Sequence, residues 1–298
     1  MSTPAEKEKQ EKQEKNLAKK VQLMRAFEGG VIVIVHTVAQ ALLAERCGAS
    51  GLIVVGRTTY QNVKKNGKVA RAPDPLQVKD VMDNVMLPAI ARVSIGHEVE
   101  ARVMQSSFVN GIDESELLGQ ADPEKFDYHK LDIPVIVCVE SFDDVVQAIY
   151  AGAAALRPKV KGANGLSLET AEDTPHIVQN TVVLDTIRAN IREYKKLRRD
   201  GKLKEKETKL NVPVKSIEEV MDNGIRLPFF AHGGIIHPVD AAFLMSSGYK
   251  GVIVSVQVFQ CKNPEKRIRS LVLATKHYKD NDLIAKLADD HGTSEAVA

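Results

Sequence analysis

Residues 31–55 read VIVIVHTVAQALLAERCGASGLIVV. The two ends of this stretch, 31–35 and 51–55, are nearly continuous apolar runs rich in valine and isoleucine, which is typical of parallel strands buried on both faces. Between them, residues 38–48 have the spacing of an amphipathic helix that ends at Gly48. The stretch therefore predicts a strand, a crossover helix and a second, parallel strand.

The same alternation continues along the chain. Further apolar runs occupy residues 88–93, 111–116, 134–139, 155–160, 228–234 and 251–259. Helical patterns lie at residues 74–85, 98–109, 142–151, 181–197, 238–248 and 264–278. Eight strands that alternate with helices over about 230 residues predict an α/β fold, a single (β/α)₈ TIM barrel. A doubly wound open sheet is the alternative, but no GxGxxG turn follows the first strand.

The barrel pattern accounts for residues 20–292. Residues 1–19 are a Lys/Glu/Gln tract, which predicts a charged, flexible and partly helical tail, and a short flexible tail is expected at 293–298. A long polar insert at 161–180 follows the sixth strand. The basic run at 195–209, KKLRRDGKLKEKETK, predicts a solvated helix end and loop, and a patch for an anion or a partner is the alternative.

The composition favours a soluble, cytoplasmic protein. The 41 basic and 39 acidic residues give a net charge of +2, which argues against a nucleic-acid scaffold. Cys47, Cys138 and Cys261 are widely spaced and predict neither a disulfide framework nor a metal site. The N-terminus has no apolar signal segment, and no apolar run approaches the length that spans a membrane.

Charged residues gather where the predicted strands end, which is the face at which barrel enzymes carry their active sites. The third, fourth and sixth runs supply Arg92, His97, Asp113, Glu114, Glu116, Arg157 and Lys159. Acids at a strand end are costly to bury unless they are paired, so Asp113 and Glu116 are expected partners for Arg92 or Arg157. A structural ion-pair network and a catalytic site explain this pattern equally well.

Several motifs then follow one another in a family-specific order. They read GGVIVIV, KVARAPDP, IGHEVEA, IDESE, AGAAALRPK, AHGGIIHPVDAAFLM, GYKGVIVSVQVF, NPEKR and ATKHY. In this order and spacing the chain resembles the PdxS/SNZ family, the synthase subunit of glutamine-dependent pyridoxal 5′-phosphate synthase. The resemblance runs from about Lys20 to Gly292, which is all of the chain except its two tails.

The resemblance implies a (β/α)₈ barrel that assembles as hexamers and dodecamers. Members of the family condense ribose 5-phosphate, glyceraldehyde 3-phosphate and ammonia, which a glutaminase partner delivers through the barrel. Pyridoxal 5′-phosphate is their product, so no cofactor is expected. Two lysines carry the chemistry by forming imines, which requires an amine that can lose its proton.

Four features expected of an active member differ in this chain. Arg92, in ARVSIGH, stands where the family has its first imine-forming lysine, and Ile34 stands where the first strand carries an acid. The phosphate loop after the second lysine corresponds to residues 160–165, VKGANG, which include Gly165. The phosphate loop on the eighth strand reads SVQVF at 255–259, so Ser255 and Val256 stand in a degenerate loop without its glycines.

Other positions agree with the family pattern. Lys159 matches the second lysine and Arg157 the arginine beside it, while Asp113 and Glu116 match the acids of the fourth strand. His97 also matches. The pair Gly233–Gly234 matches a place where backbone approaches phosphate, although a tight turn explains it equally well. The arginine that binds glyceraldehyde phosphate is not placed, because the insert at 161–180 disturbs the register.

These differences favour a non-catalytic paralogue that co-assembles with an active synthase subunit and changes its stability, activity or partner binding. Two alternatives remain open: an active pyridoxal 5′-phosphate synthase, and a barrel enzyme with a shifted substrate that uses Lys159 as its only imine-forming amine. Residues 20–30 resemble only loosely the family's helix that docks the glutaminase, so that partner is left open. Sugar phosphates are the expected ligands, and neither a metal, a nucleic acid nor a membrane is expected.

Overall fold

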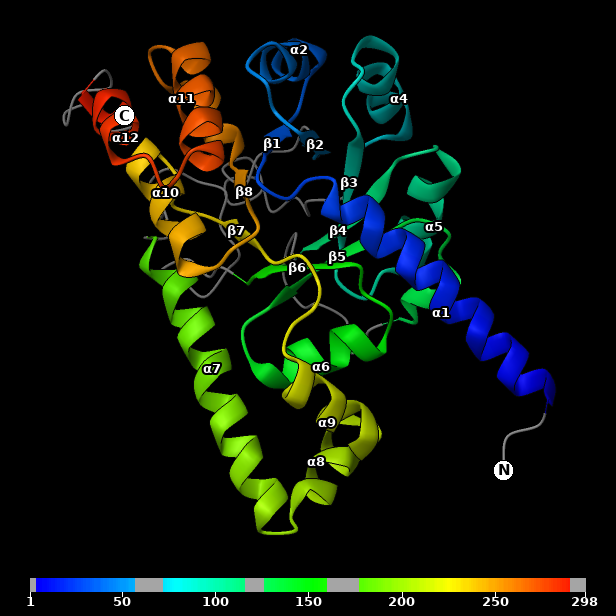
Figure 1. The fold of residues 1–298 in the computed structure, drawn as a ribbon. Helices are drawn as coiled ribbons and strands as arrows, with labels where there is room; N and C mark the ends of the chain where they lie inside the picture. The colour runs from blue at the N-terminus through cyan, green and yellow to red at the C-terminus, as the bar shows by residue number, and fades with distance from the viewer. Residues whose placement is uncertain (1–3, 57–71, 116–125, 160–176, 290–298) are drawn as a thin grey trace, which may run out of the picture.

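Eight parallel strands form one sheet that is rolled into a barrel (Figure 1). The computed structural model describes residues 4–56, 72–115, 126–159 and 177–289. The strands are β1 (Val31–Val35), β2 (Gly51–Val54), β3 (Ala89–Ser94), β4 (Gly111–Ser115), β5 (Val135–Val139), β6 (Ala155–Pro158), β7 (Phe230–His232) and β8 (Gly251–Val254). Their order in the sheet is β6-β5-β4-β3-β2-β1-β8-β7. A single parallel bridge between Leu156 and Phe229 joins the two ends of the sheet, which confirms the barrel and excludes the open doubly wound sheet.

Helices alternate with the strands and cover the outside of the barrel (Figure 1). Those that follow the predicted patterns are α2 (Val38–Arg46), α4 (Pro75–Asn84), α5 (Glu98–Ser106), α6 (Phe142–Tyr150), α7 (Val178–Arg199), α10 (Pro238–Ser247) and α11 (Pro264–Lys276). The structure adds α1 (Pro4–Arg25), α8 (Leu203–Leu210), α9 (Val214–Asn223), α12 (Asn281–Asp289) and the 3₁₀ turns η1 (Tyr128–Lys130) and η3 (Val256–Gln260). The eighth apolar run is therefore a strand only as far as Val254, and its remainder is a 3₁₀ turn.

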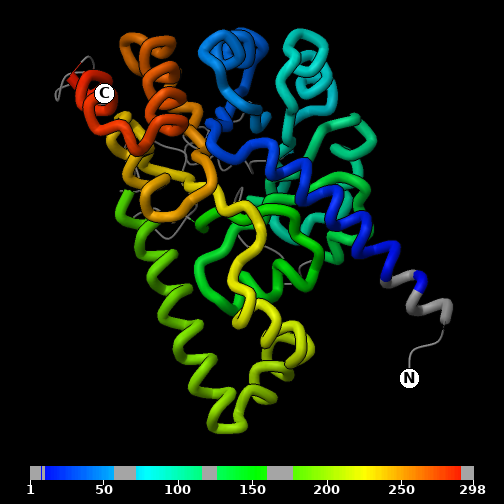
Figure 2. The backbone as a smooth tube through the Cα atoms, in the orientation of Figure 1, coloured from blue at the N-terminus to red at the C-terminus, as the bar shows by residue number. Residues whose placement is uncertain are grey.

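The N-terminal helix closes the base of the barrel. Helix α1 includes most of the charged segment that precedes residue 20, and its N-terminal half extends away from the barrel (Figure 2). Met24, near the other end of α1, and Phe27, in the turn that follows, are buried against the inward side chains of the strands. The chain then turns at Gly29 and Gly30 into β1, where Phe27 O accepts a hydrogen bond from Gly30 N at 3.1 Å.

A buried lysine fixes α1 to the barrel wall. The ammonium of Lys20 donates to the backbone carbonyls of Tyr128, at 3.2 Å, and of Leu131. Burial lowers the pKa of Lys20, although Asp132 and Asp127 partly oppose this shift. The C-terminal half of α1 is thus held by a specific polar contact as well as by apolar packing.

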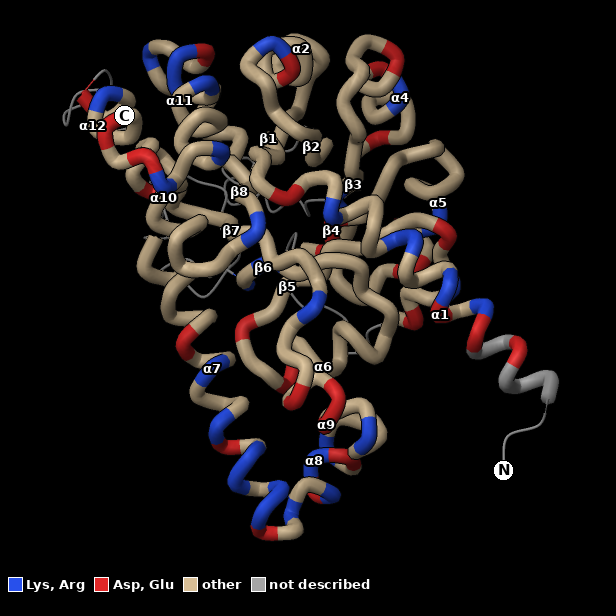
Figure 3. Tube along the Cα trace, viewed as in Figure 1, with Lys and Arg blue, Asp and Glu red and all other residues tan. Residues whose placement is uncertain are grey.

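The connection between β6 and β7 forms a helical projection. Helix α7 runs beyond the barrel, and α8 and α9 return along it (Figure 1). The basic run at 195–209 spans the end of α7 and most of α8, and Figure 3 shows its lysines and arginines along the outside of this projection. The predicted solvated helix end is present, but α8 replaces the predicted loop because Leu203 and Leu210 give it an apolar side that is buried.

The inner layer at the base of the barrel is apolar. The inward side chains of Ile32, Ile53, Ile90, Ile136 and Ile253, on β1, β2, β3, β5 and β8, are fully buried. None of the helices in the described part of the chain is both long and apolar enough to span a membrane.

Candidate functional site

The inward side chains change from apolar to charged towards the carboxyl ends of the strands. Because side chains alternate along a strand, Arg92 follows Ile90 on the inward face of β3. Asp113 on β4 is its direct neighbour in the sheet. Arg92, Asp113 and Arg157 of β6 are 1, 0 and 2% exposed, so they form a buried charged layer above the apolar base.

Asp113 holds the two arginines together. Its Oδ2 accepts a hydrogen bond from Nε of Arg92 at 2.7 Å, and its Oδ1 accepts one from Nε of Arg157 at 2.6 Å. Burial opposes ionisation of the Asp113 carboxyl, but the charges of Arg157 and Arg92 outweigh it and lower the pKa. The structure thus places Asp113 between the two arginines that the sequence offers as its partners.

Arg157 also reaches β7. Its Nη2 donates to the carbonyl of Glu114 at 3.1 Å, and its Nη1 lies 3.5 Å from Nδ1 of His232. Burial, reinforced by the charges of Arg157 and Arg92, lowers the pKa of His232 well below its ordinary value, so the imidazole is neutral. His232 precedes the glycine pair in AHGG, and the sequence-based prediction named only the glycines of this motif.

The neutral His232 makes stability depend on pH. Its pKa is lower in the folded chain than in the unfolded chain, so the stability it contributes is present above about pH 6.5 and is lost as the pH falls. We expect His232→Asn to remove about 1.4 kcal/mol per pH unit from the slope of the unfolding free energy below pH 6. Urea unfolding between pH 5 and 8 measures this slope, and equal slopes for both proteins would contradict the assignment.

Lys159 directly follows β6. It lies two residues after Arg157, and its backbone N–H donates to the carbonyl of Val139 at 2.8 Å. Lys159 is partly buried. Cys138, whose neighbour across the sheet is Arg157, is buried, and burial raises the pKa of its thiol to about 11. Lys159 is thus a lysine at the carboxyl end of β6.

Ile34 and His97 occupy different surroundings from the charged layer. Ile34 is fully buried among the inward apolar side chains, beside Ile53 of β2. An alkyl side chain at this position can neither accept a proton nor pair with Arg92. His97 is exposed and caps α5, because its Nδ1 accepts a hydrogen bond from the N–H of Glu100 at 3.3 Å. Its described contacts are those of a helix cap.

Two buried groups that no sequence motif singled out complete the surroundings. Tyr128 donates from its hydroxyl to Glu114 Oε2 at 2.5 Å, and Glu114 Oε1 accepts from the N–H of Gly96 at 2.9 Å. Asn180, at the start of α7, accepts from the N–H of His232 at 3.0 Å and donates to the carbonyl of Gly233 at 3.0 Å. Only the three-dimensional fold brings these distant segments together, so local spacing carries no signal for them.

The glycine pair and the eighth strand enclose a small cavity. Gly233 and Gly234 have φ angles of 89° and 71°, a conformation that favours glycine. With Ser255 and Arg267 they line a cavity of 30 Å³, about the size of one water molecule. The hydroxyl of Ser255 is buried there and has no hydrogen-bond partner among the described residues, and Val256 begins η3. The described residues therefore leave space for no more than a small polar group.

Part of the predicted site lies outside the described residues. Glu116, Gly165 and most of the insert at 161–180 belong to this part of the chain. Among the residues that are described, Arg92, Asp113 and Arg157 come together near the carboxyl ends of the strands, and Lys159 directly follows β6. This arrangement places two buried guanidinium groups around one carboxylate, with an amine on the residue that follows the strand.

Comparisons with known proteins agree on one family. The model of the SOR/SNZ family matches residues 16–244. The probable pyridoxal 5′-phosphate synthase subunit SNZ2 of Saccharomyces cerevisiae is 34% identical over 277 residues, which cover 92% of this chain and 89% of the yeast protein. The pyridoxal 5′-phosphate synthase subunit PdxS of Dictyoglomus turgidum is 36% identical over 274 residues, covering 91% and 88%. PdxS of Thermus thermophilus is 35% identical over 269 residues, covering 89% and 87%.

Proposed function

The chain belongs to the SOR/SNZ family, and from this membership we propose that it is a pyridoxal 5′-phosphate synthase subunit of vitamin B6 biosynthesis. We propose further that it has lost the first imine-forming step and acts as a non-catalytic partner or regulator of active synthase subunits. Its subunit contacts, in a homo- or hetero-oligomer, would then be its contribution to the pathway.

The observation that carries this proposal is the state of Arg92. A guanidinium stays protonated at any pH that a protein survives, so it has no free lone pair with which to attack a sugar aldehyde. Arg92 is also buried and bonded to Asp113, and by its resemblance motif ARVSIGH it stands where we expect the family's first lysine. Ile34, nearby in the barrel interior, supplies no acid to assist proton transfer.

Intact-mass spectrometry after incubation with ribose 5-phosphate tests the lost step. We expect no covalent pentose adduct on the purified chain, because the residue at position 92 cannot form an imine. Arg92→Lys is the gain-of-function variant, and we expect a partial adduct but not full synthase activity, since Ile34 and the degenerate loops remain. A pentose adduct on the unaltered chain would overturn the proposal.

Lys159 supports a second candidate, a barrel enzyme with a shifted substrate. It is a partly buried amine two residues after Arg157, at the end of the strands where barrel enzymes bind their substrates, and an amine of this kind suits a phosphorylated aldehyde. If the unaltered chain forms an adduct with such an aldehyde and Lys159→Met abolishes it, this second candidate holds. Native mass spectrometry of a mixture with an active PdxS-type subunit tests the partner role separately, and mixed oligomers are the expected result.

A further inference from the structure

The end of the helical projection carries concentrated positive charge. Residues 192–209, which span the end of α7 and most of α8, contain nine basic and four acidic residues, a net charge of +5. Because the whole chain carries +2, the rest of the molecule is slightly negative. Figure 3 shows these lysines and arginines along the part of the projection farthest from the barrel, where a partner has access to them.

Four of these cations form a stripe along one side of α7, which we call the basic stripe. They follow one another at intervals of three, one and three residues, which places them on one face of the helix: Arg192, Lys195, Lys196 and Arg199. All four are exposed. Val183 and Tyr194 lie on the opposite face and are buried. The basic stripe therefore points into solvent.

The basic stripe has no ion pair with any residue that the structure describes. Two other cations of the projection are paired: Arg198 lies 2.9 Å from Asp222, and Lys206 lies 3.3 Å from Asp143. Like charges three or four residues apart on a helix are destabilising by about 0.2–0.5 kcal/mol per pair. The stripe therefore leaves a repulsion on the surface that an acidic partner would relieve.

The helix dipole explains only part of the stripe. Cations in the last turn of a helix are favoured because the C-terminal end of the helix carries a partial negative charge. Lys196 and Arg199 lie in the last turn of α7, whereas Arg192 and Lys195 precede it. Half of the stripe is therefore placed where it gives no benefit to the helix itself.

Contacts with neighbouring helices hold the stripe in a fixed place. Tyr194 is buried, its hydroxyl donates to the carboxylate of Asp143 on α6, and its ring packs against Phe142 at 4.9 Å between centroids. The ammonium of Lys206, on α8, lies 4.5 Å from the centroid of the same ring and donates to Asp143 at 3.3 Å. Helices α7 and α8 are thus both fastened to α6, on the side of α7 opposite the stripe.

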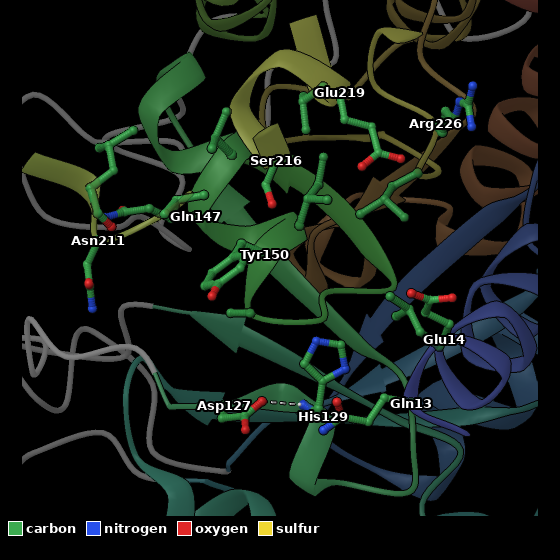
Figure 4. Close-up of a pocket in the computed structure, with 18 of the residues that line it drawn as sticks. Gln13, Glu14, Asp127, His129, Gln147, Tyr150, Asn211, Ser216, Glu219 and Arg226 are labelled. Atoms are coloured by element: carbon green, nitrogen blue, oxygen red, sulfur yellow. Dashed lines mark hydrogen bonds between the residues drawn. The ribbon is translucent and has the colours of Figure 1, made fainter. Parts of the chain in front are cut away.

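The stripe is separate from the other open surface of this region. A cavity lies between α1, α6 and α9, and Glu14, Tyr150 and Glu219 are among the residues that line it (Figure 4). Among its described lining residues, none belongs to α7. The stripe also lies at the end of the projection away from the barrel, so its binding does not depend on the proposed synthase role.

The geometry of the stripe favours an acidic helix as its partner. The stripe spans about 10 Å along α7, since each residue of a helix rises 1.5 Å. Carboxylates at the same three- and four-residue spacing on a partner helix recur over the same interval, so each of them can face a cation. We propose that the basic stripe binds a helix of a partner protein that carries aspartate or glutamate along one face.

Two other occupants fit the stripe less well. A nucleic acid would meet the negative charges of Glu193 and Asp200 beside the stripe, and the one aromatic residue of 192–209, Tyr194, is buried and cannot stack on a base. A second copy of this chain would bring two basic stripes together and increase the repulsion. Both occupants remain distinguishable from an acidic helix by experiment.

Fluorescence anisotropy on the full chain tests the proposal with two labelled, alanine-rich helical peptides. Both have the same composition, but one carries its glutamates at three- and four-residue spacing on one face, whereas the other distributes them around the helix. We expect the one-faced peptide to bind at least tenfold more tightly at about 20 mM salt, and its binding to weaken as added salt screens the charges.

Two variants of equal charge locate the binding. The stripe variant is the quadruple substitution Arg192→Gln, Lys195→Gln, Lys196→Gln, Arg199→Gln. Its matched control removes the same charge from exposed sites elsewhere: Lys79→Gln, Lys250→Gln, Lys262→Gln, Lys276→Gln. We expect the stripe variant to bind the one-faced peptide about tenfold more weakly or worse, and the control to bind it within about twofold of the unaltered chain.

Thermal unfolding separates binding from a structural role. Glutamine has a helix propensity close to that of lysine and arginine, and the stripe variant loses its like-charge repulsion, so its unfolding midpoint should not fall below that of the control. Equal binding of the two peptides, or unchanged binding by the stripe variant, would overturn the assignment. A single-stranded oligonucleotide that binds more tightly than the one-faced peptide would overturn it in favour of a nucleic acid. Self-association that the stripe variant abolishes, with no peptide binding, would overturn it in favour of a second copy.

Discussion

Asp113→Ala is expected to lower the unfolding free energy by about 3–5 kcal/mol at pH 7. The substitution leaves the guanidinium groups of Arg92 and Arg157 buried beside each other without the carboxylate that bonds to both. Removing one member of a buried charged cluster costs more than removing the whole cluster, because the remaining charges stay desolvated. Urea unfolding of both proteins measures the difference.

The matched control removes all three charges. We expect the triple variant Arg92→Met, Asp113→Leu, Arg157→Met to lie within about 2 kcal/mol of the unaltered chain, since apolar groups of similar volume often replace a buried ion cluster without loss. If the triple variant is as unstable as Asp113→Ala, the cost comes from packing and not from unpaired charge.

The effect of Asp113 has a defined pH dependence. Its pKa is lower in the folded chain than in the unfolded chain. The stability it contributes is therefore fully present above the unfolded value of about 3.9 and is lost as the pH falls through the lower folded value. The difference between the unaltered chain and Asp113→Ala should stay constant from pH 5 to 8 and shrink only in stronger acid.

Phe27→Ala is expected to lower the unfolding free energy by about 3–5 kcal/mol, because the substitution leaves a cavity where the buried ring packs at the base of the barrel. Phe27 is 3% exposed and packs beside Gly51. Phe108→Ala is the matched control: Phe108 is 84% exposed, and its loss should change stability by no more than about 0.5 kcal/mol. Denaturant unfolding compares the two.

A double-mutant cycle ties this effect to one contact. A Cβ added at Gly51 would lie 2.4 Å from Cε1 of Phe27, so Gly51→Ala should be destabilising in the unaltered chain. In a Phe27→Ala background most of that cost should disappear, because the clashing ring is absent. If the losses of unfolding free energy from Gly51→Ala and Phe27→Ala are additive, the cost of Gly51→Ala does not come from a clash with the ring of Phe27.

The barrel could be predicted from the sequence because its strands are local and repetitive. Each of the strands β1 to β6 lies within one of the predicted runs, because strands covered on both faces are mostly apolar. The charged residues of β3, β4 and β6 are the exceptions. The pairing of Arg92 with Asp113 could also be predicted from the sequence, because consecutive strands of a barrel are neighbours and both residues lie near the carboxyl ends of their strands.

Long-range contacts could not be predicted in the same way. His232 meets Arg157 across 75 positions of sequence, and Asn180 holds the end of β7 from within a segment that reads as a polar insert. Residues 4–19 contain few apolar residues and read as a solvated tail, yet they belong to the helix whose other end carries the buried Met24. In each case the side chain's environment is made by another element and not by its sequence neighbours.

The single bridge between Leu156 and Phe229 gives the barrel a seam. The other adjacent strands are joined by two to five residue pairs in register, so β6 and β7 have the shortest pairing in the barrel wall. The crossover that carries α7, α8 and α9 connects the same two strands, so its movement need not break the pairing of any other strands. We therefore expect local opening of the barrel wall to begin between β6 and β7, where Arg157 and His232 face each other from the two strands.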